Sequence, residues 1–218
     1  MAYAYEDQVH ESILRMVPAD GKVIGSIGCG PAATEGVLVR QGREVHGVDV
    51  AQEVYEIARP RLTSLRIISP DDRTPFAPES LDGLILADVI EHLPAAWDAL
   101  RQYAQAVRPG GWVIISVPNM RYVEAMARYV LRGDWPEEET GIFDRTHLQF
   151  MTHRRLARWI HQAGLTPERW FRRPDPRHPR RSWVLNLLNA GLLGLLSNLL
   201  DYQIQVRCRK PKGAAEAR

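Results

Sequence analysis

The chain has 218 residues, of which 45% are hydrophobic and 25% are charged, a size and composition that predict one folded domain and exclude wholesale disorder. The net charge of +2 conceals an uneven distribution, because residues 151–218 carry 14 Lys and Arg against 4 Asp and Glu. An acidic body with a basic C-terminal third suggests that this third contacts something that the body does not.

The cysteine content and the N-terminus predict a cytoplasmic protein. Cys29 and Cys208 are the only cysteines, so at most one disulfide could form, and a reducing compartment is expected. The N-terminus lacks the basic and apolar regions of a secretory signal. Residues 183–200 contain no charge, but asparagines interrupt them and they fall short of the roughly 20 apolar residues that a membrane span needs.

Strands and helices alternate through the first half of the chain, after a predicted helix over residues 5–17. Apolar runs predict strands over residues 22–27, 44–48, 65–69, 81–87 and 112–117. Helical patterns between them cover residues 34–41, 52–62 and 97–107. Nearly continuous apolar strands are typical of a parallel sheet covered on both faces, so an α/β, doubly wound fold is predicted.

The pattern changes after Pro118. We expect helices over 121–131 and 152–163, the second capped by Thr152, and strands over 165–171 and 202–208. A single domain over 1–210 would then include an N-terminal helix or lid (1–20) and a disordered tail (211–218). Residues 120–150 and 172–200 are expected as insertions beside the acceptor or at an interface.

The turn after the first strand predicts a nucleoside-binding site. Gly28 and Gly30 separate a strand from a helix, where backbone can approach a ligand closely. Asp49 follows Gly28 by 21 residues and ends the second strand, where an acid can bind ribose hydroxyls. The spacing to Ala33 also fits a dinucleotide fingerprint, so both cofactor classes stay open on this turn alone.

Four motifs in order, IGCG (27–30), GVDV (47–50), DVIEHLP (88–94) and RPGGWVIISVPN (108–119), resemble class I S-adenosylmethionine-dependent methyltransferases. The segment GIFDRTHLQFMT (141–152) resembles the DRTHLRFF-like signature of a subgroup of small methyltransferases. The resemblance covers about residues 3–170. It implies a Rossmann-like seven-stranded sheet of order 3-2-1-4-5-7-6, with strand 7 antiparallel and helices on both faces.

The resemblance also implies the cofactor, S-adenosyl-L-methionine, with S-adenosyl-L-homocysteine as product. The residues that it places at the cofactor run from the methionine end through the ribose and adenine to the sulfonium and an N-terminal lid: Gly28, Cys29, Gly30, Asp49, Val50, Asp71, Asp72, Ala87, Asp88 and Tyr5. Two positions depart from the family pattern. Ser26 replaces an acid that often helps to orient the methionine ammonium, and Ala32 replaces a third glycine.

Methyl transfer to a hydroxyl or amine needs an aligned nucleophile and a base. His147 is the first candidate base, with Asp144 to orient it, and His92 is the second. The alternatives are that Asp144 or Thr146 caps a turn, that His147 is structural, and that Glu91 and His92 order their loop. The expected acceptor contacts are Arg145, Trp135 and Asn119. No metal site is predicted, because the triplet Asp88, Glu91 and His92 alone is weak support for one.

These observations predict a methyltransferase that acts on O or N of a small-molecule, sugar, peptide or lipid-linked acceptor. The alternatives are an NAD(P)-dependent oxidoreductase and a non-catalytic cofactor-binding module that acts through its basic, apolar tail. For residues 172–200 we expect helices buried on the sheet or in a homodimer interface, with peripheral membrane contact as the alternative. Nucleic-acid binding is not expected, because no recognised motif accompanies the arginines.

Overall fold

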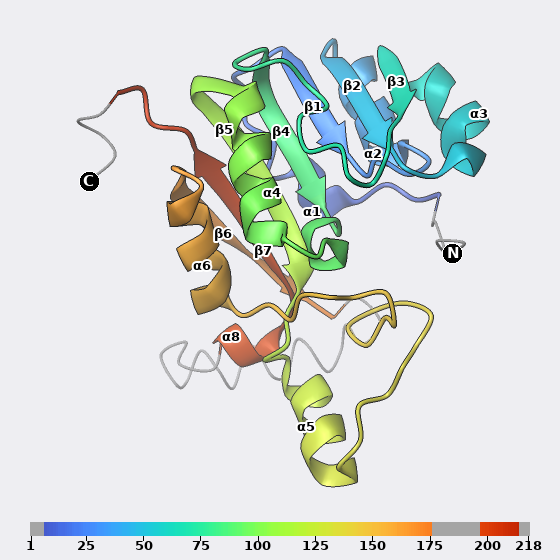
Figure 1. The fold of residues 1–218 in the computed structure, drawn as a ribbon, viewed down its shortest axis with the longest axis vertical. Coiled ribbons are helices and arrows are strands. Elements are labelled where there is room, and N and C mark those ends of the chain that lie inside the picture. Colours follow the sequence, from blue (N-terminus) through green and yellow to red (C-terminus); the bar gives the residue numbers. More distant parts are fainter. Residues whose placement is uncertain (1–6, 176–196, 214–218) are drawn as a thin grey trace.

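A computed structural model describes residues 7–175 and 197–213 of the chain (Figure 1). Its sheet has seven strands in the order β3-β2-β1-β4-β5-β7-β6, and β7 runs antiparallel to both of its neighbours. This order and direction confirm the predicted fold. The strands are β1 Val23–Ile27, β2 Glu44–Asp49, β3 Ser64–Ile67, β4 Leu81–Ala87, β5 Val107–Pro118, β6 Thr166–Pro174 and β7 Asp201–Arg209.

Helices cover both faces of this sheet (Figure 1). The α-helices are α1 Glu11–Leu14, α2 Ala33–Arg40, α3 Tyr55–Ala58, α4 Ala96–Tyr103, α5 Val123–Arg132, α6 His153–Gln162 and α8 Ser197–Leu200. Short 3-10 turns adjoin them: η1 Gln52–Val54, η2 Arg59–Arg61, η3 Ile90–His92 and η4 Ala104–Ala106. Thr152 caps α6 as predicted, since its hydroxyl accepts a hydrogen bond from the Arg155 N–H at 3.2 Å.

The central strands bury side chains on alternate faces. Leu84 and Leu86 belong to the core cluster that includes the buried faces of α4 and α6. Ile85, between them, belongs to the opposite cluster, which includes Leu38 of α2. Because apolar clusters cover both faces, successive apolar residues of β4 are all buried, and polar side chains lie at the ends of the strand.

Three predicted boundaries are wrong for identifiable reasons. The helix predicted over 5–17 is a single turn in the described part of the chain. The helix predicted over 52–62 divides into η1, α3 and η2, and the change from α3 to η2 occurs where Pro60 has no N–H to donate. The turn predicted at Pro109–Gly111 lies inside β5, opposite a shift in register between Leu81 and Gly83.

Ion pairs at the outer strands neutralise part of the positive charge of the C-terminal third. Arg207 and Arg209 both contact Glu168 across the β6–β7 pair, at 2.8 and 2.9 Å. Arg209 also reaches Asp20 at 2.7 Å, and Arg172 pairs with Asp201 at 3.0 Å. These arginines therefore stabilise the edge of the sheet in addition to giving it charge.

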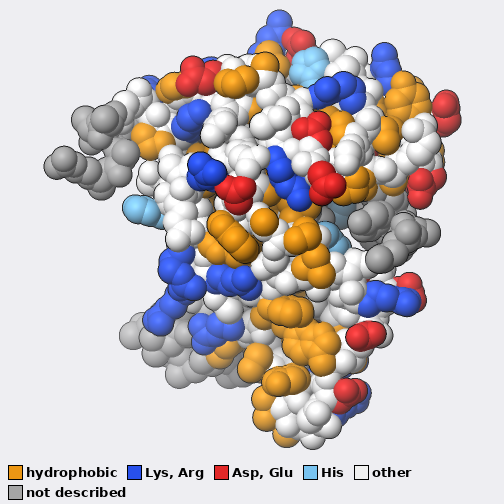
Figure 2. Space-filling model, in the orientation of Figure 1, with side chains coloured by type: hydrophobic (Ala, Val, Ile, Leu, Met, Phe, Trp, Pro, Cys, Tyr) orange, Lys and Arg blue, Asp and Glu red, His pale blue; other side chains and the backbone are white. Residues whose placement is uncertain are grey.

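Helix α5 extends away from the sheet and carries exposed apolar side chains (Figures 1 and 2). Leu131 is 83% exposed and Val130 is 65% exposed. This helix belongs to the segment 120–150, which we expect beside the acceptor. The lid residue Tyr5, most of the apolar stretch 183–200 and the end of the tail lie outside the described residues. Within the described ranges, no helix has the length and apolar character that crossing a membrane requires.

The close packing of β4 on β5 gives a stability prediction. Gly83 lies directly opposite Trp112, whose side chain is fully buried, and a Cβ at position 83 would overlap the indole ring. We expect Gly83→Ala to lower the free energy of unfolding by about 1–3 kcal/mol, measured by urea denaturation. The control is Gly213→Ala, because a Cβ there meets nothing within 4 Å. Equal losses in the two variants would contradict this packing.

Candidate active site

The turn between β1 and α2 needs glycine at two positions. Gly28 and Gly30 have φ angles of 65° and 50°, in the left-handed region. The Gly28 N–H donates to the Val48 carbonyl at 2.8 Å, which ties the turn to the end of β2. A Cβ on Gly28 would lie 2.7 Å from Cγ2 of Val89, so the turn also packs closely on the end of β4.

Asp49 organises this edge of the sheet. Its side chain is 2% exposed, and its Oδ2 accepts a hydrogen bond from the Gly30 N–H at 2.7 Å. Its Oδ1 accepts from the N–H groups of Val50 and Ala51, at 2.8 and 3.0 Å. The structure thus brings Gly28, Gly30 and Asp49 together as predicted. The Asp49 carboxylate binds backbone donors here, and its predicted contact with ribose stays a prediction.

A buried glutamate lies beside the position where the family acid is missing. Ser26 donates through Oγ to Oε1 of Glu35 at 2.8 Å, and both side chains are buried. Burial raises the pKa of the Glu35 carboxyl above its ordinary value. Glu35 comes from α2, and sequence reasoning missed it because an acid in the first turn of a helix usually faces solvent. Cys29, whose thiol pKa burial raises, adjoins both Glu35 and Asp49.

The end of β4 places Asp88 at the same edge. Asp88 has a φ of 54°, and its N–H donates to the Ser116 carbonyl of β5 at 2.9 Å. Its carboxylate accepts from Nε2 of Gln203 in β7, at 2.8 and 3.1 Å. Sequence reasoning missed Gln203, because only the folded sheet brings the start of β7 to this point. Ala87, which precedes Asp88, is half-buried.

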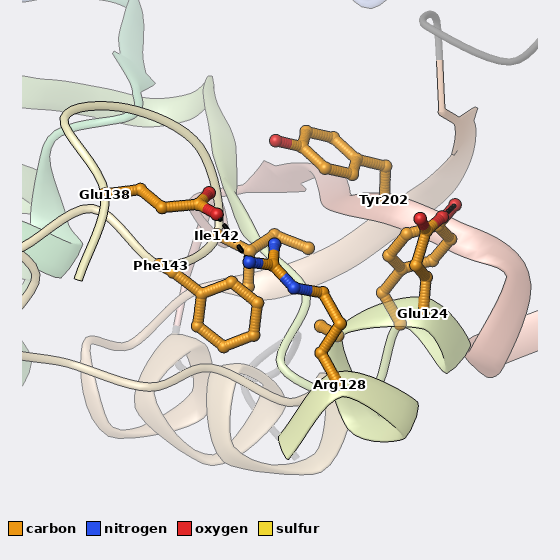
Figure 3. A pocket seen from close by; sticks show the side chains of 8 residues that line it. Glu124, Arg128, Glu138, Ile142, Phe143 and Tyr202 are labelled. Carbon is orange, nitrogen blue, oxygen red and sulfur yellow. Dashed lines mark hydrogen bonds and ion pairs between the residues drawn. The ribbon is translucent and has the colours of Figure 1, made fainter. Parts of the chain in front are cut away.

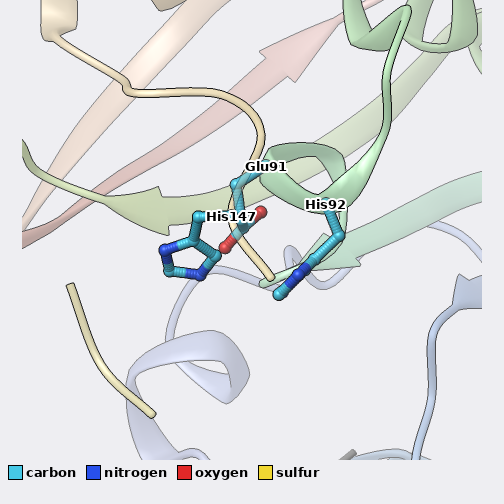
Figure 4. A group of neighbouring side chains, drawn as sticks. All are labelled: Glu91, His92 and His147. Atoms are coloured by element: carbon cyan, nitrogen blue, oxygen red, sulfur yellow. The ribbon is translucent and has the colours of Figure 1, made fainter. Parts of the chain in front are cut away.

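Glu91 and His92 of η3 form a cluster with His147, which is distant in sequence (Figure 4), and Asp88 lies beside Glu91. Potential ligand atoms of Glu91, His92 and His147 all lie within 4.8 Å of one another. Glu91 is 0% exposed, and among the described residues no hydrogen-bond donor reaches either of its carboxylate oxygens. Burial raises the pKa of Glu91 well above its ordinary value, and the nearby charge of Asp88 raises it further.

Hydrogen bonds fix the orientation of both imidazoles. The Thr146 hydroxyl donates to Oδ1 of Asp144 at 2.6 Å, so toward His92 it acts as an acceptor, and Nδ1 of His92 donates to it at 2.9 Å. Nδ1 of His147 donates a hydrogen bond to the Ile142 carbonyl at 3.3 Å. Burial lowers the pKa of both histidines. Near pH 7 each ring is therefore neutral, and the lone pair of His147 is on Nε2.

The DRTH segment packs directly onto η3. The N–H groups of Leu148 and Gln149 both donate to the carbonyl of Glu91, at 2.8 and 2.9 Å. Asp144 accepts from the Thr146 N–H at 2.7 Å and so caps a turn, which was the alternative to its predicted role. Through Thr146, Asp144 positions His92, whereas the prediction has it orienting His147.

The predicted acceptor residues occupy different surroundings. Asn119 is fully buried, and its amide donates to the carbonyls of Asn198 and Asp201 at 2.9 and 2.7 Å, a structural role that disfavours contact with an acceptor. Trp135 packs edge-on against Phe143 and Phe150, each at 5.0 Å between ring centroids. These contacts make Trp135 part of an aromatic cluster in the loop.

The remaining predicted residues lie nearer the surface. Arg145 forms an exposed ion pair with Glu139. Asp71 is exposed, and Asp72 accepts a hydrogen bond from the Thr74 N–H at 3.0 Å, so both belong to the loop after β3. Val50 is 37% exposed beside Asp49, as packing on an adenine ring would require.

A separate cleft lies between α5 and the loop 138–143 (Figure 3). Arg128 of α5 crosses it to pair with Glu138 at 2.7 Å. The lining is completed by six further residues of α5 and its N-cap, the loop and β7: Tyr122, Glu124, Ala125, Ile142, Phe143 and Tyr202. The ion pair already fills much of this cleft, so it is a less suitable acceptor site than the cluster beside Asp88.

Comparisons with known proteins agree with this geometry. The sequence profile of a family described as a methyltransferase domain matches residues 1–169. A ubiquinone biosynthesis O-methyltransferase of Hydrogenovibrio crunogenus is 30% identical over 166 residues, which cover 71% of this chain and 66% of that protein. The chain thus matches just under two thirds of that relative's length.

Solved structures share the fold at low identity. A SAM-dependent methyltransferase of Archaeoglobus fulgidus superposes with a TM-score of 0.62 at 15% identity, over 87% of this chain and 86% of that one. The [4+2]-cyclase SpnF gives a TM-score of 0.65 at 15% identity, over 93% of this chain and 79% of that one. Likeness at this identity shows the fold alone, and the second structure shows that one fold can support different reactions.

The buried Glu35 gives a pH-dependent stability prediction. Between the ordinary glutamate pKa of 4.5 and the raised pKa in the folded protein, the folded state binds more protons than the unfolded state. Stability from this group is therefore complete below pH 4.5 and falls as pH rises toward the folded pKa. We expect Glu35→Gln, which keeps the acceptor for Ser26, to flatten this decline in urea titrations between pH 4 and 8. Exposed Glu53→Gln should keep the wild-type slope.

Proposed function

Because the chain belongs to the methyltransferase domain family, we propose that it transfers the methyl group of S-adenosylmethionine to a hydroxyl oxygen of a small-molecule acceptor. The observation that carries this proposal is the cluster that holds the neutral imidazole of His147 just after β4, where Val89 packs against Gly28 of the glycine turn. The O-methyltransferase relative supports oxygen as the receiving atom.

The cofactor would lie along the carboxyl-terminal edge of β1, β2 and β4. Gly28, Cys29 and Gly30 would face its methionine part, while Asp49 and Val50 would bind the ribose and the adenine. Glu35 would supply the negative charge that position 26 lacks, since Ser26 holds its carboxylate at 2.8 Å. A bound ammonium would favour the ionised form of Glu35, which burial otherwise opposes.

A hydroxyl acceptor loses a proton during transfer, whereas a neutral amine can attack before its proton leaves. The built-in proton acceptors therefore favour a hydroxyl. His147 is half-buried, and its Nδ1 is held by the Ile142 carbonyl, so its Nε2 is the proton acceptor. In the step, the O–H bond breaks toward Nε2, the O–CH3 bond forms, and the S–CH3 bond breaks with its electron pair on sulfur.

Cofactor binding is tested by calorimetry with S-adenosylhomocysteine and, separately, with NADH. We expect S-adenosylhomocysteine to bind and NADH not to bind. NADH is tested because the glycine spacing alone left the dinucleotide class open. Glu35→Gln should weaken S-adenosylhomocysteine binding by about tenfold or more, the free-energy scale of one charge-assisted hydrogen bond. Glu53→Gln, an exposed change, is the control. Binding of NADH alone would contradict the proposed function.

The role of His147 is tested by methyl transfer. Transfer of label from methyl-tritiated cofactor is measured on a panel of phenols, catechols and aliphatic alcohols. We expect His147→Ala to lower kcat by about 10²–10⁴-fold, the usual contribution of a general base, and to leave S-adenosylhomocysteine affinity unchanged. His161→Ala, at an exposed position in α6, is the matched control. Undiminished turnover in His147→Ala would remove His147 from the reaction.

A further inference from the structure

We propose that Arg173, near the end of β6, binds a carboxylate group of the acceptor, so that the enzyme acts on a hydroxy acid. The inference rests on the proposed function and deepens it, because that function defines the acceptor by its hydroxyl alone. The charge distribution suggests that the basic C-terminal third contacts something that the acidic body does not. Arg173 is a point at which this positive charge comes close to the candidate active site.

The first argument is the position of Arg173 in the sheet. Arg173 lies directly opposite Gln203 in the antiparallel β6–β7 ladder. Opposed residues of such a ladder place their side chains on the same face of the sheet. The side chain of Arg173 therefore lies on the face where Nε2 of Gln203 donates to the Asp88 carboxylate at 2.8 Å. The ladder thus brings a guanidinium to the same edge as the end of β4.

The second argument is the reach of the Arg173 side chain. The order β4-β5-β7-β6 separates Arg173 from Asp88 by three strand spacings of about 4.8 Å, or roughly 14 Å between backbones. Burial raises the pKa of Asp88, and the hydrogen bond from Gln203 and the positive charge of Arg173 oppose that rise. Because charges more than about 10 Å apart are largely screened, the guanidinium lies nearer to Asp88 than its own backbone does.

The third argument is that Arg173 pairs with no acid in the described part of the chain. Its side chain is half-buried, and its Nε is buried where no acceptor among the described residues reaches it. Other arginines of β6 and β7 pair with acids at 2.8–3.0 Å. Asp88, the acid of this edge, is bound by Gln203 instead. A guanidinium that has lost hydration without a full set of partners favours an anionic ligand.

Charge and shape together select a carboxylate. The N–H donors of a guanidinium form a planar fork that matches the two oxygens of a carboxylate. A phosphate monoester would bring nearly two negative charges to one guanidinium beside Asp88, whereas a carboxylate brings only one. With its carboxylate at Arg173 and its hydroxyl at Nε2 of His147, the acceptor lies across the ends of β5 and β7. Arg173 is then a specificity-determining residue that fixes the end of the acceptor away from the reacting oxygen.

Acceptor binding is measured by calorimetry on full-length protein saturated with S-adenosylhomocysteine. The probes are protocatechuate, homoprotocatechuate and hydrocaffeate, which hold a carboxylate at increasing distance from a catechol ring, and the neutral amide of each. We expect wild type to bind at least one carboxylate tenfold or more tightly than its amide. Arg173→Gln should abolish this preference, and Arg173→Lys, which lacks the fork, should keep only part of it. Arg169→Gln, an exposed change in the same strand, is the control.

Methyl transfer gives a second measurement of the same preference. With the best carboxylate probe, Arg173→Gln should lower kcat/KM at least tenfold through KM, and kcat/KM for the matching amide should not change. Arg173→Glu should instead favour dopamine, which carries an ammonium in place of the carboxylate. Unchanged affinity for S-adenosylhomocysteine and an unchanged circular dichroism spectrum show that each variant is folded.

The outcomes separate this proposal from the proposed function. Equal binding of carboxylates and amides by wild type, or a preference that survives in Arg173→Gln, would overturn the carboxylate site, even if methyl groups are transferred. Weaker S-adenosylhomocysteine binding by folded Arg173→Gln would also overturn it, because Arg173 would then bind the carboxylate of the cofactor. A carboxylate preference that depends on Arg173, without transfer to any probe, would support the site and leave the O-methylation proposal unsupported.

Discussion

The structure depends on one constraint, the burial of the sheet on both faces. Side chains of β4 point alternately into two apolar clusters, so neither face offers room for a polar site. Ligand chemistry is therefore confined to the edge where the parallel strands end. Gly30, Asp49 and Asp88 lie at that edge because β1, β2 and β4 all end there.

Three buried acids at this edge are stabilised in different ways, and the differences indicate their roles. Asp49 accepts three backbone hydrogen bonds, which suits a group that shapes the turn. Glu35 accepts one hydrogen bond from Ser26 and keeps a raised pKa, which suits a group that becomes ionised beside a cationic ligand. Glu91 is fully buried beside Asp88 and has a strongly raised pKa, which suits a carboxyl group that holds its proton in the folded protein.

Much of the fold could be predicted because apolar strands and glycine turns are local signals. All seven predicted strands exist, and the IGCG and GVDV motifs do meet at one edge. The interrupted helix at Pro60 could have been predicted from that proline. The partners Glu35 and Gln203 could not, since their significance arises from contacts with Ser26 and Asp88 that form only in the folded chain. The role of Asp144 could not be predicted either, because its carboxylate binds Thr146, and the Thr146 hydroxyl in turn contacts His92.

The backbone carbonyl and the carboxylate of Glu91 contact different parts of the site, and this affects how the site assembles. Its carbonyl holds the segment that carries His147, while its carboxylate faces the cluster which that imidazole completes. Anything that binds only the assembled cluster must also favour the docked segment, and the reverse holds to the same extent. Docking of the segment that carries His147 and binding of a ligand at the cluster would then share a single equilibrium. Each would raise the other's occupancy by the same factor, so that a productive site assembles as a unit.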